Sequence, residues 1–512
     1  MKIESSNKYV ILLICAISAL ILSPLWHYEY HRDELLFLSY GNHLAMGYYS
    51  TPPLMGLLSF IILHLPIDTY ITIRIIGMIS FFLLLLYSTK LIKLFSNSLV
   101  LQIFTVLVMI LAQQKETLMY LVTGFDTVVT TIASYHLLRF LLQHNKKDII
   151  LFAVLLGIGI NNKYTILFFF TILLILLFYK KQMPLNAKEI KIAGIILLAF
   201  IIPNFFWQIK HDFMFMKYVS HVQTNQTKGA NRIALLFKML FSNELGFIFI
   251  VLGIWEMFKK NLTTKLFAIA ALCCMLFVSV VKGKSYYCNN FFPLIYCFGI
   301  LKLYDLKTTQ KTKQIASAGV LLLLIPHFLC ESFILTPKGL LNYSQFLRKH
   351  VSSNILKYEG GSSQNSKNIL PHTHANMLGW NALVKEISNS CNKYNSDSIY
   401  IFCQNYGEAA AVEIIGKKYN LPSPLSFHDN FYYWSCKRII KQPAVMLIVS
   451  KNGYSQNLAQ LFRNSTNYVF KDDYAVEDMA GIYVFTNPSH SFAEYWQYIL
   501  PKIDNPSAAY IL

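Results

Sequence analysis

Up to about residue 335, long apolar runs alternate with short polar segments along the chain. The runs are about 15 to 22 residues long, and a helix that crosses a bilayer needs roughly 20 residues. They predict about eleven membrane spans. The expected spans are residues 9–26, 70–89, 99–113, 126–143, 149–161, 164–180, 190–208, 244–258, 266–281, 286–303 and 315–335. The pattern therefore predicts an α-helical polytopic membrane domain over residues 1–335.

The amino terminus begins with a short basic segment and an apolar run. Lys2 and Lys8 precede the run, which extends from Tyr9 to Leu25. This arrangement is similar to a signal peptide, but no small-x-small cleavage motif follows it. We therefore expect an uncleaved first span.

The lysines in the loops between the runs set the expected orientation. Short loops rich in lysine and arginine stay on the cytoplasmic side of a membrane. With the amino terminus inside, every inside loop carries such a cluster. The clusters are Lys90 and Lys93; Lys146 and Lys147; Lys180, Lys181 and Lys188; Lys259, Lys260 and Lys265; and Lys302, Lys307, Lys311 and Lys313. Three regions are then expected outside: the loop 27–69, the segment 208–243 and the tail from 336 onward.

The composition fits a chain that is solvated largely by lipid. Only 14% of the 512 residues are charged, whereas soluble proteins carry about 25%. The formal net charge of +19 comes from lysines in small loop clusters, and not from a basic face interleaved with aromatic residues. The sequence therefore predicts membrane lipid, and not nucleic acid, as a partner.

The tail, residues 336–512, changes in character and predicts a separate domain. A stretch rich in glycine and serine, residues 358–366, is typical of a linker. After it, short apolar strands are expected to alternate with helices, which is typical of a small α/β domain. The expected strands are 398–404, 444–450 and 481–485, and the expected helices are 381–389 and 407–419. By the predicted topology this domain is extracytoplasmic.

The nine cysteines form neither a metal pattern nor a disulfide framework, because their number is odd and their spacings are irregular. Cys391, Cys403 and Cys436 lie in the tail. One pair among these three can form a bridge, and the sequence does not decide whether one does.

An adjacent pair of acids, Asp33 and Glu34, follows the first expected span. Two carboxylates at a membrane boundary are unfavourable unless they are paired or solvated. Their presence therefore needs a functional or structural explanation. One can take a proton from an acceptor hydroxyl while its neighbour orients the substrate or holds a cation. The structural alternative is the start of a helix, where the dipole stabilises acidic side chains. These residues alone leave both interpretations open.

The loop that carries the acidic pair resembles a known family. After Asp33-Glu34 come His-Leu-Ala-Met-Gly-Tyr-Tyr at 43–49 and Pro-Pro-Leu at 52–54. The pattern resembles the first external loop of bacterial family 39-like glycosyltransferases, which are relatives of the dolichyl-phosphate-mannose protein mannosyltransferases and of the lipid A aminoarabinose transferase. Further similar stretches are 156–164, 202–208, 283–287, 405–411, 421–424 and 426–430. The resemblance therefore covers nearly the whole chain.

This resemblance implies the multi-span C-type glycosyltransferase architecture and a sugar donor linked to polyprenyl phosphate. It implies Asp33 as the catalytic carboxylate, Glu34 as its neighbour in the same motif, and inversion at the anomeric carbon. One position departs from the pattern. Relatives often have His or Gln before the Pro-Pro pair, where this chain has Thr51, so the resemblance implies no substrate contact there.

Asp126, in the segment 123–127, is the candidate metal ligand. By the resemblance it matches an acidic position near the active site that helps to hold a divalent cation in some relatives, and no other cofactor is implied. The structural alternative is a cap for the helix expected at 126–143. The external histidines are His31, His43, His211 and His221, and their spacing is not that of a zinc site.

Three lysines, Lys163, Lys282 and Lys284, lie at expected outer ends of spans, against the usual inside bias of positive residues. A lysine at such an end can extend to the interface by snorkelling, which is the structural alternative. Their position beside aromatic residues favours an anionic ligand, and a lipid phosphate fits the interface. Arg74 is a further candidate, because a guanidinium group matches phosphate geometry.

Glu408, in the tail, lies where an expected strand passes into an expected helix. The carboxyl edge of a parallel sheet is where α/β domains bind ligands, so Glu408 is a candidate for the substrate pocket. The alternative is an acid in the first turn of a helix, with a purely structural role.

Together these features predict a transferase of hexosyl or pentosyl units in the bacterial inner membrane, acting outside the cytoplasm. The donor is expected to be a polyprenyl-phosphate sugar, and the acceptor a glycolipid, lipopolysaccharide, surface polymer or protein. The expected pocket residues are His43, Tyr48, Tyr49, Tyr286, Tyr287 and Glu408. The alternative is a transporter or flippase for a lipid-linked sugar, which predicts ionisable residues in mid-span and broken helices near the bilayer midplane. A membrane scaffold leaves the acidic pair and the outer lysines unexplained.

Overall fold

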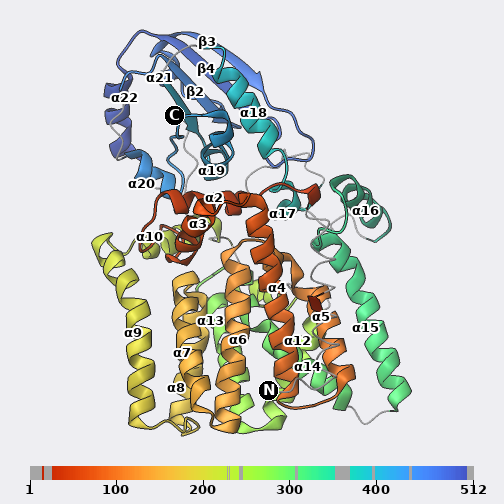
Figure 1. Ribbon diagram of the computed structural model, residues 1–512. Helices are drawn as coiled ribbons and strands as arrows, with labels where there is room; N and C mark the ends of the chain where they lie inside the picture. The colour runs from red at the N-terminus through yellow and green to blue at the C-terminus, as the bar shows by residue number, and fades with distance from the viewer. Residues whose placement is uncertain are drawn as a thin grey trace. The chain divides into compact units, whose positions relative to one another are not determined.

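The computed structural model describes residues 14–15, 26–227, 229, 231–241, 246–305, 309–351, 370–394, 398–436 and 441–503. The chain divides into two compact units (Figure 1). The helical unit comprises Met1–Pro24, Thr51–Leu54 and Pro66–Ile334. The mixed unit comprises Leu25–Ser50, Met55–Leu65 and Leu335–Leu512.

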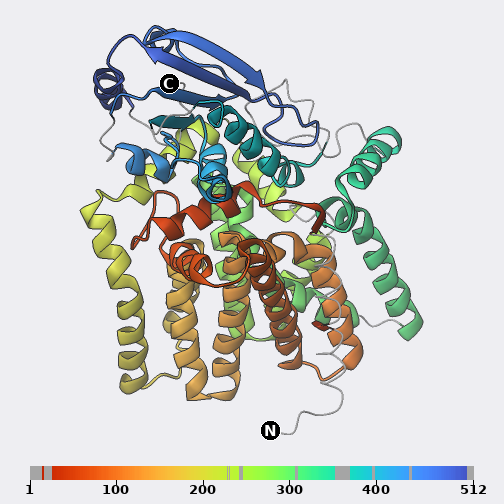
Figure 2. The ribbon, with the colours of Figure 1, turned by 45° about the horizontal axis from the view of Figure 1, so that its top comes forward.

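The helical unit consists of helices, most of which lie where the apolar runs occur, while three short ones lie in the segment 208–243. They are α4 (Thr69–Lys93), α5 (Leu99–Leu118), α6 (Val122–Gln143), α7 (Lys146–Asn162), α8 (Thr165–Tyr179), α9 (Ala187–Lys210), α10 (Met214–His221), the π-helical turn η2 (Val222–Gln226), α11 (Arg232–Leu240), α12 (Phe247–Lys260), α13 (Leu262–Val280), the 3-10 helix η4 (Ser285–Phe291), α14 (Phe292–Asp305) and α15 (Gln310–Glu331). A helix is present at each expected span from 70–89 to 315–335, whereas the first, 9–26, lies almost wholly outside the described residues. Figures 1 and 2 show the long helices running side by side.

Within the described part of the chain, four helices are long and apolar enough to cross a membrane. They are α4, α9, α13 and the Lys311–Glu331 part of α15. Leu99–Gln113 of α5 and Thr165–Tyr179 (α8) are shorter apolar helices. A helix rises 1.5 Å per residue, so roughly 20 residues match the 30 Å hydrocarbon layer of a bilayer. The four long helices therefore have the lengths and compositions of membrane spans.

The helix α9 has its polar side chains inside and its apolar side chains outside. Its buried residues are Asn204 and Gln208, whereas Phe205 and Phe206 are 51% and 63% exposed. The Tyr164 hydroxyl donates to Asn204 Oδ1 over 2.5 Å and accepts from Gln208 Nε2 over 3.2 Å. This arrangement is the reverse of a soluble helix and suits contact with lipid, in which polar groups must be satisfied within the protein.

Two glycines allow α12 and α14 to pack backbone against backbone. A Cβ atom at Gly253 would overlap the carbonyl oxygen of Ile295, and one at Gly299 would overlap the carbonyl oxygen of Phe249. Small residues at helix contacts let helices approach closely in membrane proteins, where dispersion forces and hydrogen bonds drive association. The α12–α14 contact therefore depends on both glycines.

Gly253→Ala is expected to destabilise the protein by about 1–3 kcal/mol, because the added methyl group meets a backbone oxygen that cannot rotate away. The measurement is the thermal unfolding midpoint in detergent, followed by intrinsic fluorescence. Gly194→Ala in α9 is the matched control, since no atom lies within 4 Å of its Cβ position. Equal midpoints for the two variants would show that the close contact does not limit stability.

The mixed unit combines helices with a small sheet. Its helices are α2 (Arg32–Asn42), most of α3 (Leu54–His64), α16 (Pro337–His350), α17 (His372–Ala375), α18 (Trp380–Cys391), α19 (Tyr406–Ile414), η5 (Gly416–Tyr419), α20 (Asn430–Cys436), α21 (Gln456–Ala459), α22 (Phe492–Ile499) and η6 (Leu500–Lys502). The expected linker at 358–366 lies outside the described residues. Cys391 and Cys403 are free thiols, so they do not form the bridge that the sequence left open.

The sheet is mixed, with strand order β1-β2-β4-β3. The strands β1 (Ile399–Cys403), β2 (Val445–Ser450) and β4 (Gly481–Pro488) lie where short apolar strands were expected. β1 and β2 are parallel, whereas β4 is antiparallel to both β2 and β3 (Phe462–Val469). Strand β3 was not expected, because it lies at the edge of the sheet and all its residues after Phe462 are exposed. An edge strand of this kind carries no apolar run.

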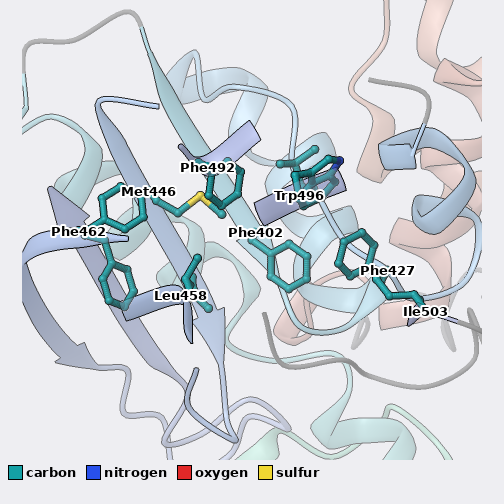
Figure 3. Close-up of a cluster of buried hydrophobic side chains, with 11 residues drawn as sticks. Phe402, Phe427, Met446, Leu458, Phe462, Phe492, Trp496 and Ile503 are labelled. Carbon is teal, nitrogen blue, oxygen red and sulfur yellow. The ribbon is translucent and has the colours of Figure 1, made fainter. Parts of the chain in front are cut away.

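A cluster of buried aromatic and aliphatic side chains packs on the sheet (Figure 3). The rings of Phe427 and Trp496 lie 4.9 Å apart between centroids, and Phe402, Met446 and Phe492 are at most 1% exposed. Burial of each such side chain stabilises the fold by roughly 1.5–3 kcal/mol. Because Phe402 belongs to β1, this core fixes the strand that leads directly into α19.

Candidate active site

The first turn of α2 carries both acids of the motif. His31 is the N-cap residue, and its Nδ1 accepts a hydrogen bond from the Asp33 backbone N–H over 3.1 Å. Glu34 Oε2 accepts from the His31 backbone N–H over 2.8 Å. This reciprocal arrangement is a capping box, which satisfies amides that a helix start leaves without partners. Glu34 is fully buried and contributes to the start of the helix.

Asp33 is half-buried and is bonded to a residue from far along the chain. The Tyr406 hydroxyl donates to Asp33 Oδ1 over 2.6 Å. The same hydroxyl accepts from Arg32 Nε over 3.0 Å and from Arg32 Nη2 over 2.7 Å. The Arg32 guanidinium also lies over the Tyr406 ring, 4.5 Å from its centroid. A tyrosine hydroxyl therefore stands between the carboxylate and the neighbouring cation.

Gly407 makes this contact sterically feasible. A Cβ atom at Gly407 would overlap Arg32 Cγ and come within 2.5 Å of Arg32 Cδ. A glycine at the start of α19 lets the Arg32 side chain pass against the backbone. The sequence pattern marked the turn at 406–408, but it gave no reason to select Arg32 or Tyr406 as site residues.

Glu408 occupies the first turn of α19, as the structural alternative expected. Its Oε2 accepts from the Asn405 backbone N–H over 3.2 Å, and Asn405 Oδ1 accepts from the Glu408 N–H over 3.1 Å. Asn405 Nδ2 also donates to Glu477 Oε1 over 3.3 Å. Burial raises the pKa of Glu408 well above its usual range, and the Glu477 charge raises it further. The contacts of Glu408 are thus those of a helix cap, whereas its burial and the Glu477 charge favour the protonated acid.

The raised pKa of Glu408 predicts a stability that depends on pH. A raised pKa stabilises the fold below the ordinary carboxyl pKa, and this stabilisation is lost as pH rises through the raised value. Glu408→Gln keeps an oxygen for the cap and removes the titration. We therefore expect its thermal midpoint to rise relative to wild type between pH 5 and pH 9. Glu386→Gln, on the exposed face of α18, is the control, and a difference that does not change with pH would contradict the assignment.

Tyr48 and Tyr49 lie in the core of the mixed unit. Tyr48 stacks on Tyr40 with centroids 3.9 Å apart, and a Cβ atom at Gly56 would overlap its hydroxyl. Burial raises the pKa of Tyr48 to about 12. Tyr49 is 2% exposed, and its backbone N–H donates to Asn430 Oδ1 over 3.1 Å. These contacts make both tyrosines part of the scaffold that holds α2.

His43 is more accessible than the two tyrosines. Its ring stacks on Trp434, with centroids 3.9 Å apart and planes 15° apart. His43 Nε2 lies 3.1 Å from Glu413 Oε1. Of the three pocket residues expected in this loop, His43 is the one with substantial exposure.

Two further residues, which the sequence did not select, lie close to the group formed by Arg32, Asp33 and Tyr406. Asp429 Oδ1 accepts from the Tyr40 hydroxyl over 3.3 Å. Burial raises the pKa of Asp429, and the Asp33 charge adds to the shift, so the two acids are electrostatically coupled. His428 Nδ1 accepts from the Tyr406 backbone N–H over 3.4 Å. Both residues belong to the 426–430 stretch that resembles the family.

The helical unit gathers a second group of candidate residues. Lys163 caps the carboxyl end of α7, and its Nζ lies 5.1 Å from the ring centroids of both Tyr286 and Tyr287. Lys284 Nζ lies 5.8 Å from the Tyr286 centroid. The structure therefore brings together two of the expected phosphate-binding lysines and two of the expected pocket tyrosines.

The other charged candidate residues of the helical unit have the following surroundings. The Lys163 charge interacts with the charges of Asp126 and Glu116. Arg74 is 1% exposed, and its guanidinium lies 4.6 Å from the Tyr70 ring centroid. Lys282 has a left-handed backbone with φ of 53° directly after α13. The contacts that define the Lys163 cluster are those of Lys163 with Tyr286 and Tyr287 and of Lys284 with Tyr286.

Asp126 does not cap α6, so the structural alternative for this residue was wrong. The helix begins at Val122 with Leu121 as its N-cap residue. Asp126 is therefore inside the helix, where its Oδ2 accepts from the Thr165 hydroxyl over 2.5 Å. Within the residues that the structure describes, no group of three His, Cys, Asp or Glu side chains can hold a metal ion. The role of Asp126 as a metal ligand therefore stays a prediction from the resemblance.

The fold of the chain is similar to that of solved structures. No family model matches the chain, and no curated protein matches it in sequence. The similar structures include two crystal structures of ArnT from Cupriavidus metallidurans, one bound to undecaprenyl phosphate and one in the apo state. For the bound form the TM-score is 0.59 at 11% identity, with 93% of this chain and 97% of that chain covered. For the apo form the TM-score is 0.61 at 11% identity, with 94% and 98% covered.

This similarity extends over nearly the full length of both proteins. ArnT is a lipid A aminoarabinose transferase with the C-type glycosyltransferase architecture. At 11% identity the comparison establishes the fold. The resemblance that the motifs predicted is therefore confirmed at this level: the chain has a mostly helical, ArnT-like fold with a small sheet.

Proposed function

We propose that this protein is a membrane glycosyltransferase that moves a sugar from a polyprenyl-phosphate carrier to an extracytoplasmic acceptor. The observation that carries the proposal is Asp33, a half-buried carboxylate at the start of α2 in a chain with the fold of ArnT. ArnT has been crystallised with undecaprenyl phosphate. The family motif around Asp33 supports the same chemistry.

In the proposed reaction Asp33 acts as the general base. Its carboxylate takes the proton of an acceptor hydroxyl, whose oxygen attacks the anomeric carbon of the donor sugar. The new carbon–oxygen bond forms as the bond from the anomeric carbon to the phosphate oxygen breaks. Polyprenyl phosphate leaves with the bonding electron pair, and the anomeric configuration inverts. A positioned base of this kind contributes about 10²–10⁴-fold to a rate.

The leaving phosphate requires fixed positive charge. Lys163 and Lys284 converge on Tyr286, and we assign this cluster to the carrier phosphate. Cations held in place before the reaction stabilise the charge that develops on a leaving group without reorganisation. Lys282 and Arg74 are further candidates for the same phosphate. Glu34 is proposed as the partner that fixes the helix turn from which Asp33 acts.

The acceptor is proposed to bind in the mixed unit. His43 is half-buried beside Trp434 and Glu413, and an aromatic face beside a carboxylate suits a sugar ring. Tyr48 and Tyr49 support α2 in this unit, and Glu408 lies in α19, the helix that also carries Glu413. The donor would supply a hexosyl or pentosyl unit in the bacterial inner membrane, with α2 and the mixed unit on the extracytoplasmic side.

Reconstituted liposomes distinguish a transferase from a flippase. The probes are undecaprenyl phosphates that carry labelled 4-amino-4-deoxyarabinose, glucose or mannose. The acceptor is the glycolipid and polymer fraction of a strain from which the gene is deleted, since that fraction holds the unmodified acceptor. We expect the label to move to the acceptor fraction. Movement of the intact donor between leaflets, with no labelled acceptor, would instead support the flippase.

A further inference from the structure

We infer that Tyr406 is a positioning residue for the base Asp33, which it orients and separates from Arg32. This inference rests on the proposed function, because it assigns Asp33 the role of base. Tyr406 lies 373 positions after Asp33 in the sequence, and its hydroxyl reaches Asp33 Oδ1 over 2.6 Å. A residue of α19 thereby orients the Asp33 carboxylate.

The direction of the hydrogen bonds around Tyr406 follows from counting donors. A tyrosine hydroxyl has one proton to donate and two lone pairs to accept. Both N–H groups from Arg32, at 3.0 and 2.7 Å, use the lone pairs. The hydroxyl proton therefore points at Asp33, where a bond to a charged oxygen is short and strong. Burial raises the pKa of Tyr406 above its usual value, so the donor remains neutral.

The position of the Tyr406 hydroxyl between Arg32 and Asp33 affects how well Asp33 can act as a base. A direct ion pair with the adjacent Arg32 would strongly favour the ionised carboxylate and weaken it as a base. With the phenol between them, Arg32 polarises the hydroxyl instead of taking a carboxylate oxygen. Asp33 then keeps a fixed orientation and enough basicity to accept a proton.

The start of α19 is fixed by several independent contacts. Asn405 and Glu408 form a capping box, Gly407 leaves room for Arg32, and the Tyr406 ring packs edge-on against His428 with centroids 5.0 Å apart. Such rigidity is what a residue needs if it is to hold a reacting group in place.

Several titratable groups surround Asp33 besides Tyr406. On its own helix turn these are His31, Arg32 and Glu34. From the other elements, the charge of Asp33 acts on Asp429, His428 accepts from the Tyr406 backbone N–H, and the charge of Glu477 acts on Arg32. Replacing Tyr406 with Phe keeps all of these groups. It also keeps a ring under the Arg32 guanidinium, whereas the hydroxyl and its hydrogen bonds to Asp33 and Arg32 are lost.

Tyr406→Phe is expected to move the acid limb of the pH–rate profile to higher pH by about one to two units, because the ionised base loses a charge-assisted hydrogen bond. At pH values below that limb, the rate of transfer is expected to be about ten- to hundredfold lower than that of wild type. The loss is expected in kcat, while KM for the donor stays unchanged. Well above it, the rate stays within about threefold of wild type. The assay uses the labelled undecaprenyl-phosphate sugar and acceptor fraction on which wild type is active.

Tyr468→Phe is the matched control. The Tyr468 hydroxyl accepts from Lys393 Nζ over 3.0 Å, and the same cation lies 4.2 Å from the ring centroid. The control therefore also loses a tyrosine hydroxyl that is bonded to a charged group and lies beside a cation, here at an exposed edge strand. Its pH profile is expected to match wild type. Thermal unfolding of each variant checks that it is folded.

The outcomes separate a positioning role from a structural one. A limb that does not move, or a loss of rate that is equal at all pH values, would overturn the inference. If Tyr406→Phe does not fold, Arg32→Met provides the second test, since loss of the polarising cation is expected to move the limb in the same direction, and an unshifted limb would overturn the inference. Absence of transfer by wild type at every pH would overturn the proposed function, and the inference with it.

Discussion

Asp33→Asn is expected to lower kcat for sugar transfer by about 10²–10⁴-fold, because the amide cannot take the acceptor proton. The amide oxygen still accepts the hydrogen bond that Tyr406 donates to Asp33 Oδ1, so the fold and the contact with α19 are expected to persist. Affinity for undecaprenyl phosphate is expected to stay within about threefold, since the carrier phosphate is assigned to other residues. The measurement is the steady-state rate of labelled-sugar transfer.

Asp473→Asn is the control for this loss. Asp473 is exposed in the same unit, and the same change of charge there is expected to leave kcat unaltered. Transfer by Asp33→Asn near the wild-type rate, in a variant that unfolds at the wild-type temperature, would show that another group acts as the base.

Lys163→Gln is expected to weaken binding of undecaprenyl phosphate at least about ten- to hundredfold, the effect of losing one charge-assisted hydrogen bond. Asp126 and Glu116 interact with the Lys163 charge. Without that charge, they would face the phosphate as uncompensated anions and add repulsion. Lys163→Arg keeps the charge and is expected to keep most of the affinity. The measurement is equilibrium binding of labelled undecaprenyl phosphate to protein in lipid nanodiscs.

Lys180→Gln controls for the loss of a lysine beside an aromatic ring. Lys180 Nζ lies 5.0 Å from the Tyr179 ring centroid, at a helix end that the sequence predicts to be cytoplasmic. Equal affinity in the Lys163 and Lys180 variants would remove Lys163 from the phosphate site and favour snorkelling as its role.

The helices of the helical unit could be predicted from the sequence because lipid imposes one strong rule. Each apolar run from 70–89 onward corresponds to a helix, since every buried backbone group in a bilayer must be bonded within its own segment. Boundaries were less predictable. The helix at Asp126 begins four residues earlier, at Val122, with no capping side chain to mark it. That early start explains why Asp126 could be mistaken for a cap.

The candidate site could be predicted only in part, because local sequence patterns do not reveal contacts between residues far apart in the chain. Asp33 was found from a motif of adjacent residues. Tyr406 and Arg32 were not selected, because their bonds join positions more than 370 residues apart and no periodicity records such a pair. The edge strand β3 was missed for a related reason: its exposed face has no apolar signal. Orientation in the membrane stays a prediction from the loop lysines.

The most direct test of the proposed function counts products in a single experiment. Wild-type protein in liposomes is supplied with an undecaprenyl-phosphate sugar labelled in both sugar and lipid, together with the acceptor fraction from the deletion strain. Catalysis by Asp33 predicts one undecaprenyl phosphate released for each sugar on the acceptor, with both products falling together in Asp33→Asn. Release of carrier without a glycosylated acceptor, or undiminished formation of both products by Asp33→Asn, would contradict it.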